Sequence, residues 1–347
     1  MSIKKFKLDP GTGSLSDDDT KSYFSRLGFS VFALGIAYYV GAVLLWTLAS
    51  RLFGADALSD RFTDTVVGYV ITVIALYGIG LPIFKVVSDA LPTMRPFKGK
   101  MRISGLFGGF CITMLAMNVG NYASNVVLLW LYNFFGIDPT NPVEEAVAPN
   151  DPAIVIVTVA FAVVLLPILE ELFFRRVVCS KILPLGEGYA IFLSGAIFGL
   201  IHANFYQFAY GFLVGSFFAF IYIKTGRLIY SIIYHMAVNL LGMVIAPWVL
   251  TLIDIDALYA LIESGATQIP ANLMGGVMAL MLYSAVTVGL GIVGVVLFFK
   301  AKKKGRLALE AGILPPPKKH RMANLFCNVG VAAAITVFTF MMVASLK

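Results

Sequence analysis

The sequence contains few charged residues. Of its 347 residues, only 13% are charged, whereas 59% are apolar, and the mean hydropathy is +0.87. A soluble domain carries about a quarter charged residues, so this composition excludes an ordinary soluble domain. The net charge of +7 does not predict nucleic-acid binding, because the basic residues lie almost entirely in short segments between long apolar runs.

Cysteine and processing signals are also scarce. Cys111, Cys179 and Cys327 are far apart and lie in or beside apolar runs. This distribution argues against a disulfide framework or a thiolate metal cluster and favours a packing role. Residues 1–26 lack an apolar stretch followed by a small-residue cleavage site, so we expect a polar cytosolic tail there instead of a cleavable signal peptide.

The apolar residues occur in long runs. A helix rises about 1.5 Å per residue and the hydrocarbon layer is about 30 Å thick, so runs of this length predict membrane crossings. Backbone groups in lipid must be satisfied within their own segment, which favours helices. We therefore predict an all-α, polytopic integral membrane protein with about 8–9 transmembrane helices. The runs lie at residues 27–50, 65–84, 103–135, 153–178, 188–206, 207–223, 228–251, 273–299 and 324–346.

Lysine and arginine predict the orientation of these helices. If the N-terminus is cytosolic and the nine runs alternate, 23 of the 26 basic residues fall on the inner side. The outer loops at 137–152 and 252–272 are acidic instead. This bias predicts a multi-pass protein of the cell membrane with a cytosolic N-terminus. The basic loop at 300–321 then faces anionic lipid headgroups.

The chain divides into four regions. They are a polar cytosolic tail (1–26), N-terminal transmembrane helices (27–136), a central membrane core in which we expect the catalytic site (153–251), and C-terminal transmembrane helices (273–347) that include the basic loop. In the core, small residues recur at four-residue spacing, as Gly195 with Gly199 and Gly211 with Gly215. Such spacing lets helix backbones approach closely in lipid, so we expect a tight hairpin of the runs 188–206 and 207–223.

The core also contains two adjacent acids. An ionisable group in a membrane helix costs at least about 2.5–3.5 kcal/mol on insertion scales, so each one needs a reason. Glu171 and Arg175 are four positions apart, which predicts an ion pair on one helix face. Glu170 lies about 100° further round the helix, so spacing leaves it available as a general base or acid. The alternative is that both acids only pair with Arg175 and Arg176.

Two histidines and an amide follow in the same core. His202 ends the run Phe198-Gly-Leu-Ile-His202, and His235 shares a helix face with Asn239. Imidazole and carboxamide groups both donate hydrogen bonds, as the stabilisation of an oxyanion requires. Each residue alone could instead make interhelical hydrogen bonds, worth about 0.5–2 kcal/mol each. Their joint presence on three helices favours a single polar site.

Several motifs of other membrane proteins are missing. The sequence has no His-Glu-x-x-His, the usual helix motif of a zinc protease. The apolar runs contain neither the rhomboid-type Gly-x-Ser-Gly nor the presenilin-type Gly-x-Gly-Asp. We also find no inverted repeat of the kind that many transporters have. Zinc ligation by two histidines and a glutamate from three helices stays open as an alternative.

The order and spacing of these residues resemble a known family. The patterns Glu170-Glu171-x-x-x-Arg175, Phe198-x-x-x-His202 and His235-x-x-x-Asn239 look like the motifs of the CAAX-protease and bacteriocin-processing (CPBP) family of intramembrane glutamic endopeptidases, also labelled abortive-infection proteins. The resemblance covers about residues 153–250. It implies that Glu170 activates water with the help of His202, and that His235 and Asn239 stabilise the oxyanion. It gives supporting roles to Glu171, Arg175 and Phe198.

The resemblance further implies an enzyme that uses no metal and no other cofactor. Its expected partners are membrane lipid and a peptide or lipidated protein substrate, and they do not include nucleic acid. Cleavage of prenylated CAAX proteins and processing of bacteriocins or leader peptides both fall within this range. The alternatives are a non-catalytic membrane immunity or scaffold protein and a zinc-dependent membrane protease.

Shared chemistry also requires similar depth in the membrane. If the runs 153–178 and 188–206 both cross fully, Glu170 lies near the cytosolic side and His202 near the outer end of its helix. Both groups must nevertheless reach one water molecule. We therefore expect the hairpin at 188–223 to be tilted or to stop short of the outer face.

Overall fold

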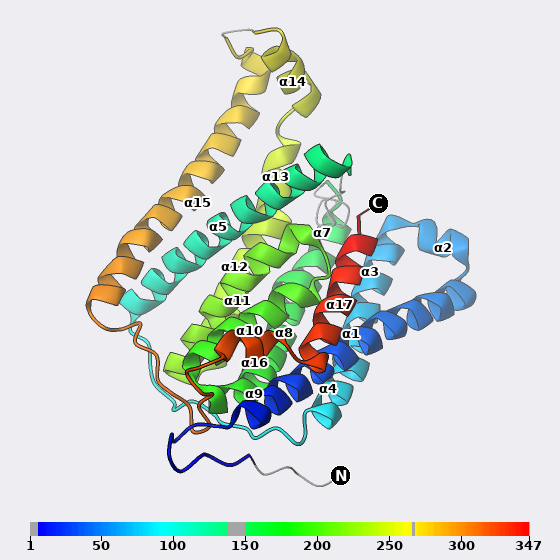
Figure 1. Ribbon diagram of the computed structural model, residues 1–347. Coiled ribbons are helices and arrows are strands. Elements are labelled where there is room, and N and C mark those ends of the chain that lie inside the picture. Colours follow the sequence, from blue (N-terminus) through cyan, green and yellow to red (C-terminus); the bar gives the residue numbers. More distant parts are fainter. Residues whose placement is uncertain (1–5, 138–149, 266–267, 347) are drawn as a thin grey trace.

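The computed structural model describes residues 6–137, 150–265 and 268–346 (Figure 1). The regular structure of these residues is helical, apart from two isolated β-bridges, Leu8–Leu15 and Gly186–Ala311. The first part contains α1 (Asp17–Phe53), α2 (Ala55–Ser59), α3 (Arg61–Thr72), η1 (Val73–Gly80), α4 (Leu81–Val87) and α5 (Ile103–Phe135). The second contains α7 (Pro152–Thr158), η2 (Val159–Leu165), α8 (Leu166–Glu171), η3 (Leu172–Cys179), α9 (Ser180–Ile182), η4 (Leu183–Leu185), α10 (Glu187–Ile201), α11 (Phe205–Thr225), α12 (Leu228–Leu240), η5 (Leu241–Ile245), α13 (Ala246–Thr251) and α14 (Ile255–Glu263). The third contains α15 (Ala271–Lys303), α16 (Arg321–Phe326) and α17 (Val329–Ala344).

Seven helical rods in the described part of the chain are long and apolar enough to cross a membrane. They span Asp17–Phe53, Arg61–Val87, Ile103–Phe135, Pro152–Leu185, Phe205–Thr225, Leu228–Thr251 and Ala271–Lys303. Two further apolar helices, α10 and α17, have 15 and 16 residues. The prediction of an all-α, polytopic membrane protein is confirmed.

Three of these rods contain a π-helical stretch that ends two residues before a proline. The stretches are η1, η2 and η5, and the prolines are Pro82, Pro167 and Pro247. Proline lacks a backbone N–H, and its ring clashes with the carbonyl four residues earlier in an α-helix. A widened π turn relieves that clash. The rods therefore continue through their prolines.

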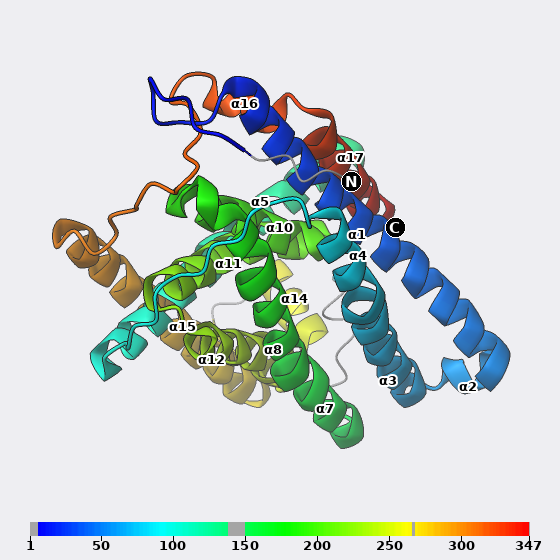
Figure 2. The ribbon, with the colours of Figure 1, turned by 90° about the horizontal axis from the view of Figure 1, so that it is seen from below.

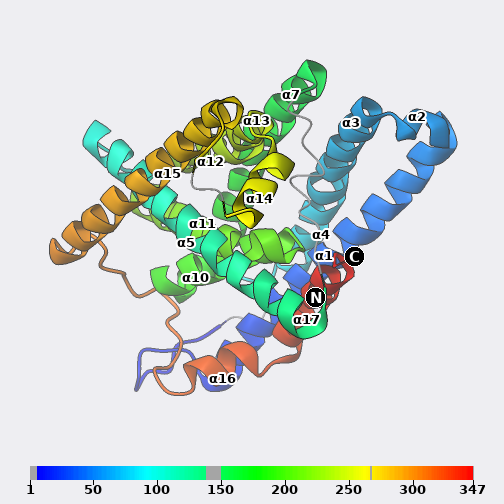
Figure 3. The same cartoon turned by 90° about the horizontal axis from the view of Figure 1, so that it is seen from above.

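The central helices lie between two flanking groups. α1, α3, α4 and α17 lie on one side, α15 lies on the other, and α8, α10, α11 and α12 lie between them (Figures 1 and 2). α5 runs obliquely across α11 and packs on both α11 and α15 (Figure 3). On the first side, α1 and α17 touch where a side chain added at Gly28 would meet the Gly330 backbone.

The polar N-terminal tail predicted at 1–26 is shorter than expected. α1 begins directly after Ser16, whose hydroxyl accepts a hydrogen bond of 3.0 Å from the Asp19 N–H and caps the helix. The first turn is acidic, which is favourable at the positive end of the helix dipole. The same acids lower the local hydropathy, so hydropathy does not predict that the helix begins here. Tyr23 and Phe24 are fully buried, so this part of the predicted tail belongs to the packed structure.

The basic segments gather at one end of the molecule. The N-terminal residues, the loop at 88–102 and the segment at 304–320 lie at this end, whereas α2 and α14 lie at the other (Figure 1). Helices that cross a membrane in alternating directions place these segments on the same side. The acidic loop predicted at 137–152 lies largely outside the described residues. Because α15 extends to Lys303, the basic loop predicted at 300–321 begins only after that residue.

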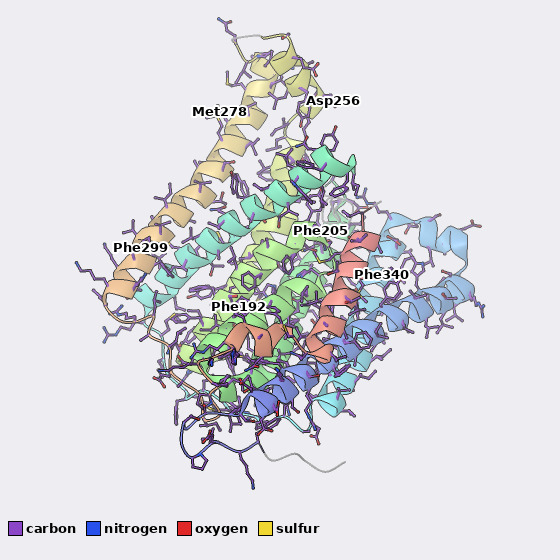
Figure 4. The ribbon with its side chains drawn as sticks, viewed as in Figure 1. Phe192, Phe205, Asp256, Met278, Phe299 and Phe340 are labelled. Atoms are coloured by element: carbon purple, nitrogen blue, oxygen red, sulfur yellow. The ribbon has the colours of Figure 1, made fainter. Side chains whose placement is uncertain are left out.

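The outer surface is apolar. Met278 and Phe299 on α15 and Phe340 on α17 lie at the periphery (Figure 4), and these side chains are 61%, 60% and 65% exposed. Soluble proteins do not present apolar surface on this scale. A helix surface of this kind is suited to contact with lipid chains.

Candidate active site

A cavity of about 540 Å³ lies among the central helices. Its walls come mainly from α5, α8, α11 and α12, with contributions from α3, η2 and η5. The four residues predicted to be catalytic all line it, namely Glu170, His202, His235 and Asn239. Residues from separate helices thus face one space, as a shared site requires.

The ion pair predicted between Glu171 and Arg175 is present. Arg175 Nε lies 2.9 Å from Glu171 Oε2 and Nη2 lies 3.3 Å from Oε1, and both side chains are fully buried. The remaining guanidinium nitrogen donates to Ser194 Oγ on α10 at 2.8 Å. This pair therefore ties the glutamate helix to α10. Since both charges are paired and hydrogen-bonded, their burial is tolerable.

Aromatic rings surround this ion pair. The Arg175 guanidinium carbon lies 5.2 Å from the centre of the Phe198 ring, 5.9 Å from that of Phe218 and 6.0 Å from that of Phe174. The His235 ring also packs on Phe198 and Phe218, at 5.5 Å from each. Cation–π attraction and the exclusion of water both strengthen the ion pair. Phe198 thus lies between Arg175 and His235, in agreement with a supporting role.

His235 lies between the two acids. Its Nδ1 is 3.2 Å from Glu171 Oε1, and its Nε2 is 3.3 Å from Glu170 Oε2. A carboxylate only accepts hydrogen bonds, so a ring protonated on both nitrogens would donate to both acids. Together with Arg175, the cluster then holds two negative and two positive groups. This balance lowers the cost of placing four ionisable groups in an apolar core.

His202 closes α10 beside the cavity. Its Nδ1 lies 2.8 Å from the Phe198 carbonyl oxygen, which can only accept, so Nδ1 carries a proton and Nε2 of the neutral ring is an acceptor. α10 has 15 residues and is therefore about 22 Å long, shorter than the roughly 30 Å hydrocarbon layer. A helix of this length can end at intermediate depth. His202 can thus share a cavity with Glu170, as the site requires.

The turn after His202 is held by Asn204. Its Oδ1 accepts from the Gln207 N–H and its Nδ2 donates to the His202 carbonyl, both at 2.8 Å. Between them, Ala203 has a φ of 52°, in the left-handed region that non-glycine residues rarely adopt. Beyond the turn, α11 packs on α10 so closely that a side chain at Gly199 would meet the backbone of Phe208. The predicted hairpin is therefore present.

Asn239 contacts the helix that carries the acids. Its Nδ2 donates to the Ala162 carbonyl oxygen at 2.8 Å. In the π-helical register of η2, this carbonyl would accept from the N–H five residues later, and that residue is Pro167, which has none. The Asn239 amide replaces the missing donor and aligns α12 with η2.

Residues 152–241 match the family model described as Type II CAAX prenyl endopeptidase Rce1-like. The chain contains an Rce1-like domain. This domain covers about a quarter of the chain, includes all seven predicted site residues and confirms the resemblance to the CAAX-protease family. The Rce1-like domain marks the protein in general terms as a membrane endopeptidase. No curated protein and no solved structure matches the chain.

The Rce1-like domain brings the predicted residues together, but some contacts differ from the expected roles. Both ring nitrogens of His235 face carboxylates, and one N–H of Asn239 is bound to Ala162. The two residues expected to stabilise an oxyanion therefore also organise the protein around Glu170. Asn239 keeps a second amide N–H, because its NH₂ group has two.

Helices outside the Rce1-like domain complete the cavity, and the sequence analysis missed their residues. α5 supplies Asn121, Ser124 and Asn125, and α3 supplies Tyr69. These three polar residues lie at spacings of three and four in the apolar run 103–135, and this spacing indicates a polar face on that helix. Which wall they would form depends on how distant helices pack, and spacing does not give that.

The described residues contain no group of three histidine, cysteine, aspartate or glutamate side chains placed to hold a metal ion. The cavity offers two histidines and Glu170, the residues on which the zinc alternative depends.

Proposed function

We propose that the protein is an intramembrane glutamic endopeptidase, which hydrolyses peptide bonds of membrane-associated or lipidated peptides with water activated by Glu170. The observation that carries this proposal is the common cavity of Glu170 and His202, with His235 bound between Glu170 and Glu171. The Rce1-like match supports the peptidase class. Prenylated CAAX proteins and bacteriocin-type leader peptides are both substrates within this proposal.

The chemistry follows from the hydrogen-bonding capacities of these groups. Glu170 takes a proton from water while the water oxygen attacks the peptide carbonyl carbon, and the C=O electron pair moves to oxygen. The acceptor Nε2 of His202 holds the second water hydrogen. The free N–H of Asn239 donates to the oxyanion, and the Nε2–H of His235 turns from Glu170 to the oxyanion once Glu170 has taken the water proton. Glu170 then passes its proton to the leaving nitrogen as the C–N bond breaks.

The ion pair behind Glu170 suits this chemistry. Glu171 is bound to Arg175 and His235, so it stays an acceptor and fixes the imidazole ring. Glu170 has one such partner and reaches the cavity, where its side chain is 17% exposed. Of the two acids, Glu170 is thus the one that a substrate water can reach.

We also propose that the protein lies in the cell membrane with a cytosolic N-terminus. The end that carries the N-terminal residues and the segments 88–102 and 304–320 would then face the cytosol and anionic headgroups. Of the expected partners, lipid and a peptide or lipidated substrate belong to this proposal.

The first test is cleavage of membrane-tethered and prenylated peptides by purified protein in lipid nanodiscs. We expect the wild type to cleave at least one of them, and Glu170→Gln to lower the rate by about 10³-fold or more, because it removes the base and keeps the shape. Glu310→Gln is the matched control, since it makes the same change at an exposed acid outside the cavity. Its rate should stay within about twofold of the wild type.

The outcomes separate the alternatives. Cleavage that survives a chelator and vanishes with Glu170→Gln supports the glutamate mechanism. Cleavage that a chelator removes and added zinc restores would move the assignment to a zinc protease. If Glu170→Gln cleaves as fast as the wild type, Glu170 is not the base and the proposal is wrong. A wild type that cleaves none of the peptides would count for the immunity or scaffold alternative.

A further inference from the structure

One face of α5 carries polar side chains that make no hydrogen bond within the described part of the chain. Asn121, Ser124 and Asn125 line the cavity. Ser124 is only 2% exposed, and its hydroxyl has no hydrogen-bond partner among the residues that the structure describes. Asn121 and Asn125 are exposed, and within the described part of the chain neither amide makes a hydrogen bond. Unpaired polar groups in a membrane core are costly, so a ligand is the natural partner.

A fourth residue on α5 shows what a structural amide does in this helix. Asn118 Nδ2 donates to the Thr287 carbonyl oxygen on α15 at 2.9 Å, and Asn118 does not line the cavity. α5 therefore has one amide that holds a neighbouring helix and two that face the cavity without a partner. The cavity face is fixed in place, because the α5 backbone at Gly120 lies against Tyr210 of α11.

The spacing of these groups matches an extended peptide. Asn121 and Asn125 are one helical turn apart, about 6 Å along the axis. Peptide groups on one side of an extended chain repeat about every 6.6–6.8 Å. A carboxamide both donates and accepts, so each can pair with the N–H and the C=O of a main-chain unit. Ser124 adds a hydroxyl between them.

We propose that Asn121, Ser124 and Asn125 form a subsite that binds the main chain of an extended peptide along α5. This inference rests on the proposed endopeptidase function and names how its substrate is held. The subsite is neutral and reads groups that every peptide shares. It therefore tolerates different substrate side chains and requires an unfolded, extended segment. These residues position the substrate and take no part in the chemical step.

The test measures binding without cleavage. Full-length Glu170→Gln protein in nanodiscs is titrated with a fluorescent, lipid-anchored hexaalanine and with the same peptide N-methylated at every second residue, in both registers. N-methylation removes main-chain donors and leaves the side chains unchanged. We expect hexaalanine to bind about tenfold more tightly than at least one methylated register, as the loss of one or two hydrogen bonds implies. Adding Asn121→Ala with Asn125→Ala should remove this difference.

Two further variants distinguish the loss of the subsite from a general loss of folding. Ser124→Ala deletes a single oxygen and should reduce the preference by about two- to fivefold. Asn118→Ala removes the amide that faces α15 and should leave the preference unchanged. The inference is overturned if hexaalanine does not bind, if methylation has no effect, or if the preference survives in the Asn121→Ala, Asn125→Ala protein. Because cleavage is not measured, failure here differs from failure of the catalytic proposal, which only the wild-type assay can show.

Discussion

Glu170 and Glu171 are neighbours of the same chemical type, but their surroundings differ. Glu171 is fully buried and bound by both Arg175 and His235, whereas Glu170 contacts His235 and the cavity. Removal of one partner from a buried pair leaves the other charge uncompensated, which costs far more than the pair contributes. These surroundings support the proposal that Glu171 stabilises the fold and that Glu170 takes part in the reaction.

This difference predicts opposite effects of the same substitution. Glu171→Gln leaves the Arg175 guanidinium without its carboxylate in a fully buried position. We expect a loss of about 3–5 kcal/mol in the free energy of unfolding, measured by titration with SDS from lipid micelles. Glu170→Gln is the matched control and should cost less than about 1.5 kcal/mol. Equal losses in the two variants would contradict the division of roles.

At the residue scale, sequence spacing predicted contacts within one helix and failed between helices. The Glu171–Arg175 pair was predictable because residues four apart share a helix face. The contact of His235 with both acids was not, because its position depends on how α12 packs on α8. Spacing therefore left Glu170 without a partner, whereas the fold gives it one.

At the scale of the helices, the Asn239 amide replaces the backbone N–H that Pro167 lacks. This replacement gives a second prediction. Asn239→Ala leaves the Ala162 carbonyl without its donor and should cost about 1 kcal/mol of stability. Pro167→Ala restores a backbone N–H that can reach this carbonyl. In that background, we expect Asn239→Ala to cost only about half as much in SDS titrations. An equal cost in both backgrounds would show that the amide does not replace the missing N–H.

The same scale explains why one helix was misjudged in length. The apolar residues run almost without interruption from 188 to 223, so hydropathy predicted two full crossings with little between them. The turn at His202, Ala203 and Asn204 contains neither glycine nor proline and is specified by side-chain bonds of Asn204 instead. The depth requirement of a shared site predicted a hairpin that is tilted or stops short of the outer face, and the 15-residue α10 is short enough to end at intermediate depth.

At the scale of the whole molecule, the cavity is larger than the family segment. The Rce1-like domain ends at residue 241, yet α5 and α3 supply part of the wall. Sequence motifs predicted residues that line the cavity, because those residues lie at fixed spacings in the central helices. Other walls of the cavity come from helices that are distant in sequence. Which residues form these walls could be seen only from the fold. We expect substrate binding to depend on α5 and α3 as much as on the motifs.

The distribution of charge over the whole molecule predicts its orientation. Lys98 lies in the loop at 88–102, at the same end as the N-terminal residues, and Ser264 follows α14 at the other end (Figure 1). Both residues are exposed, so a cysteine at either position can react with a thiol reagent. The excess of basic residues at the first end predicts that Lys98 lies in the cytosol and Ser264 outside.

This orientation can be measured with a reagent that does not cross membranes. Cys111 and Cys179 are buried and Cys327 is exposed, so Cys327→Ser gives an unreactive background. In that background, an impermeant maleimide should label Ser264→Cys in intact cells, and Lys98→Cys only after permeabilisation. The reverse pattern would place the N-terminus outside. Labelling of both positions in intact cells would show that these two ends do not lie on opposite sides of the membrane, because the barrier between them must then be absent.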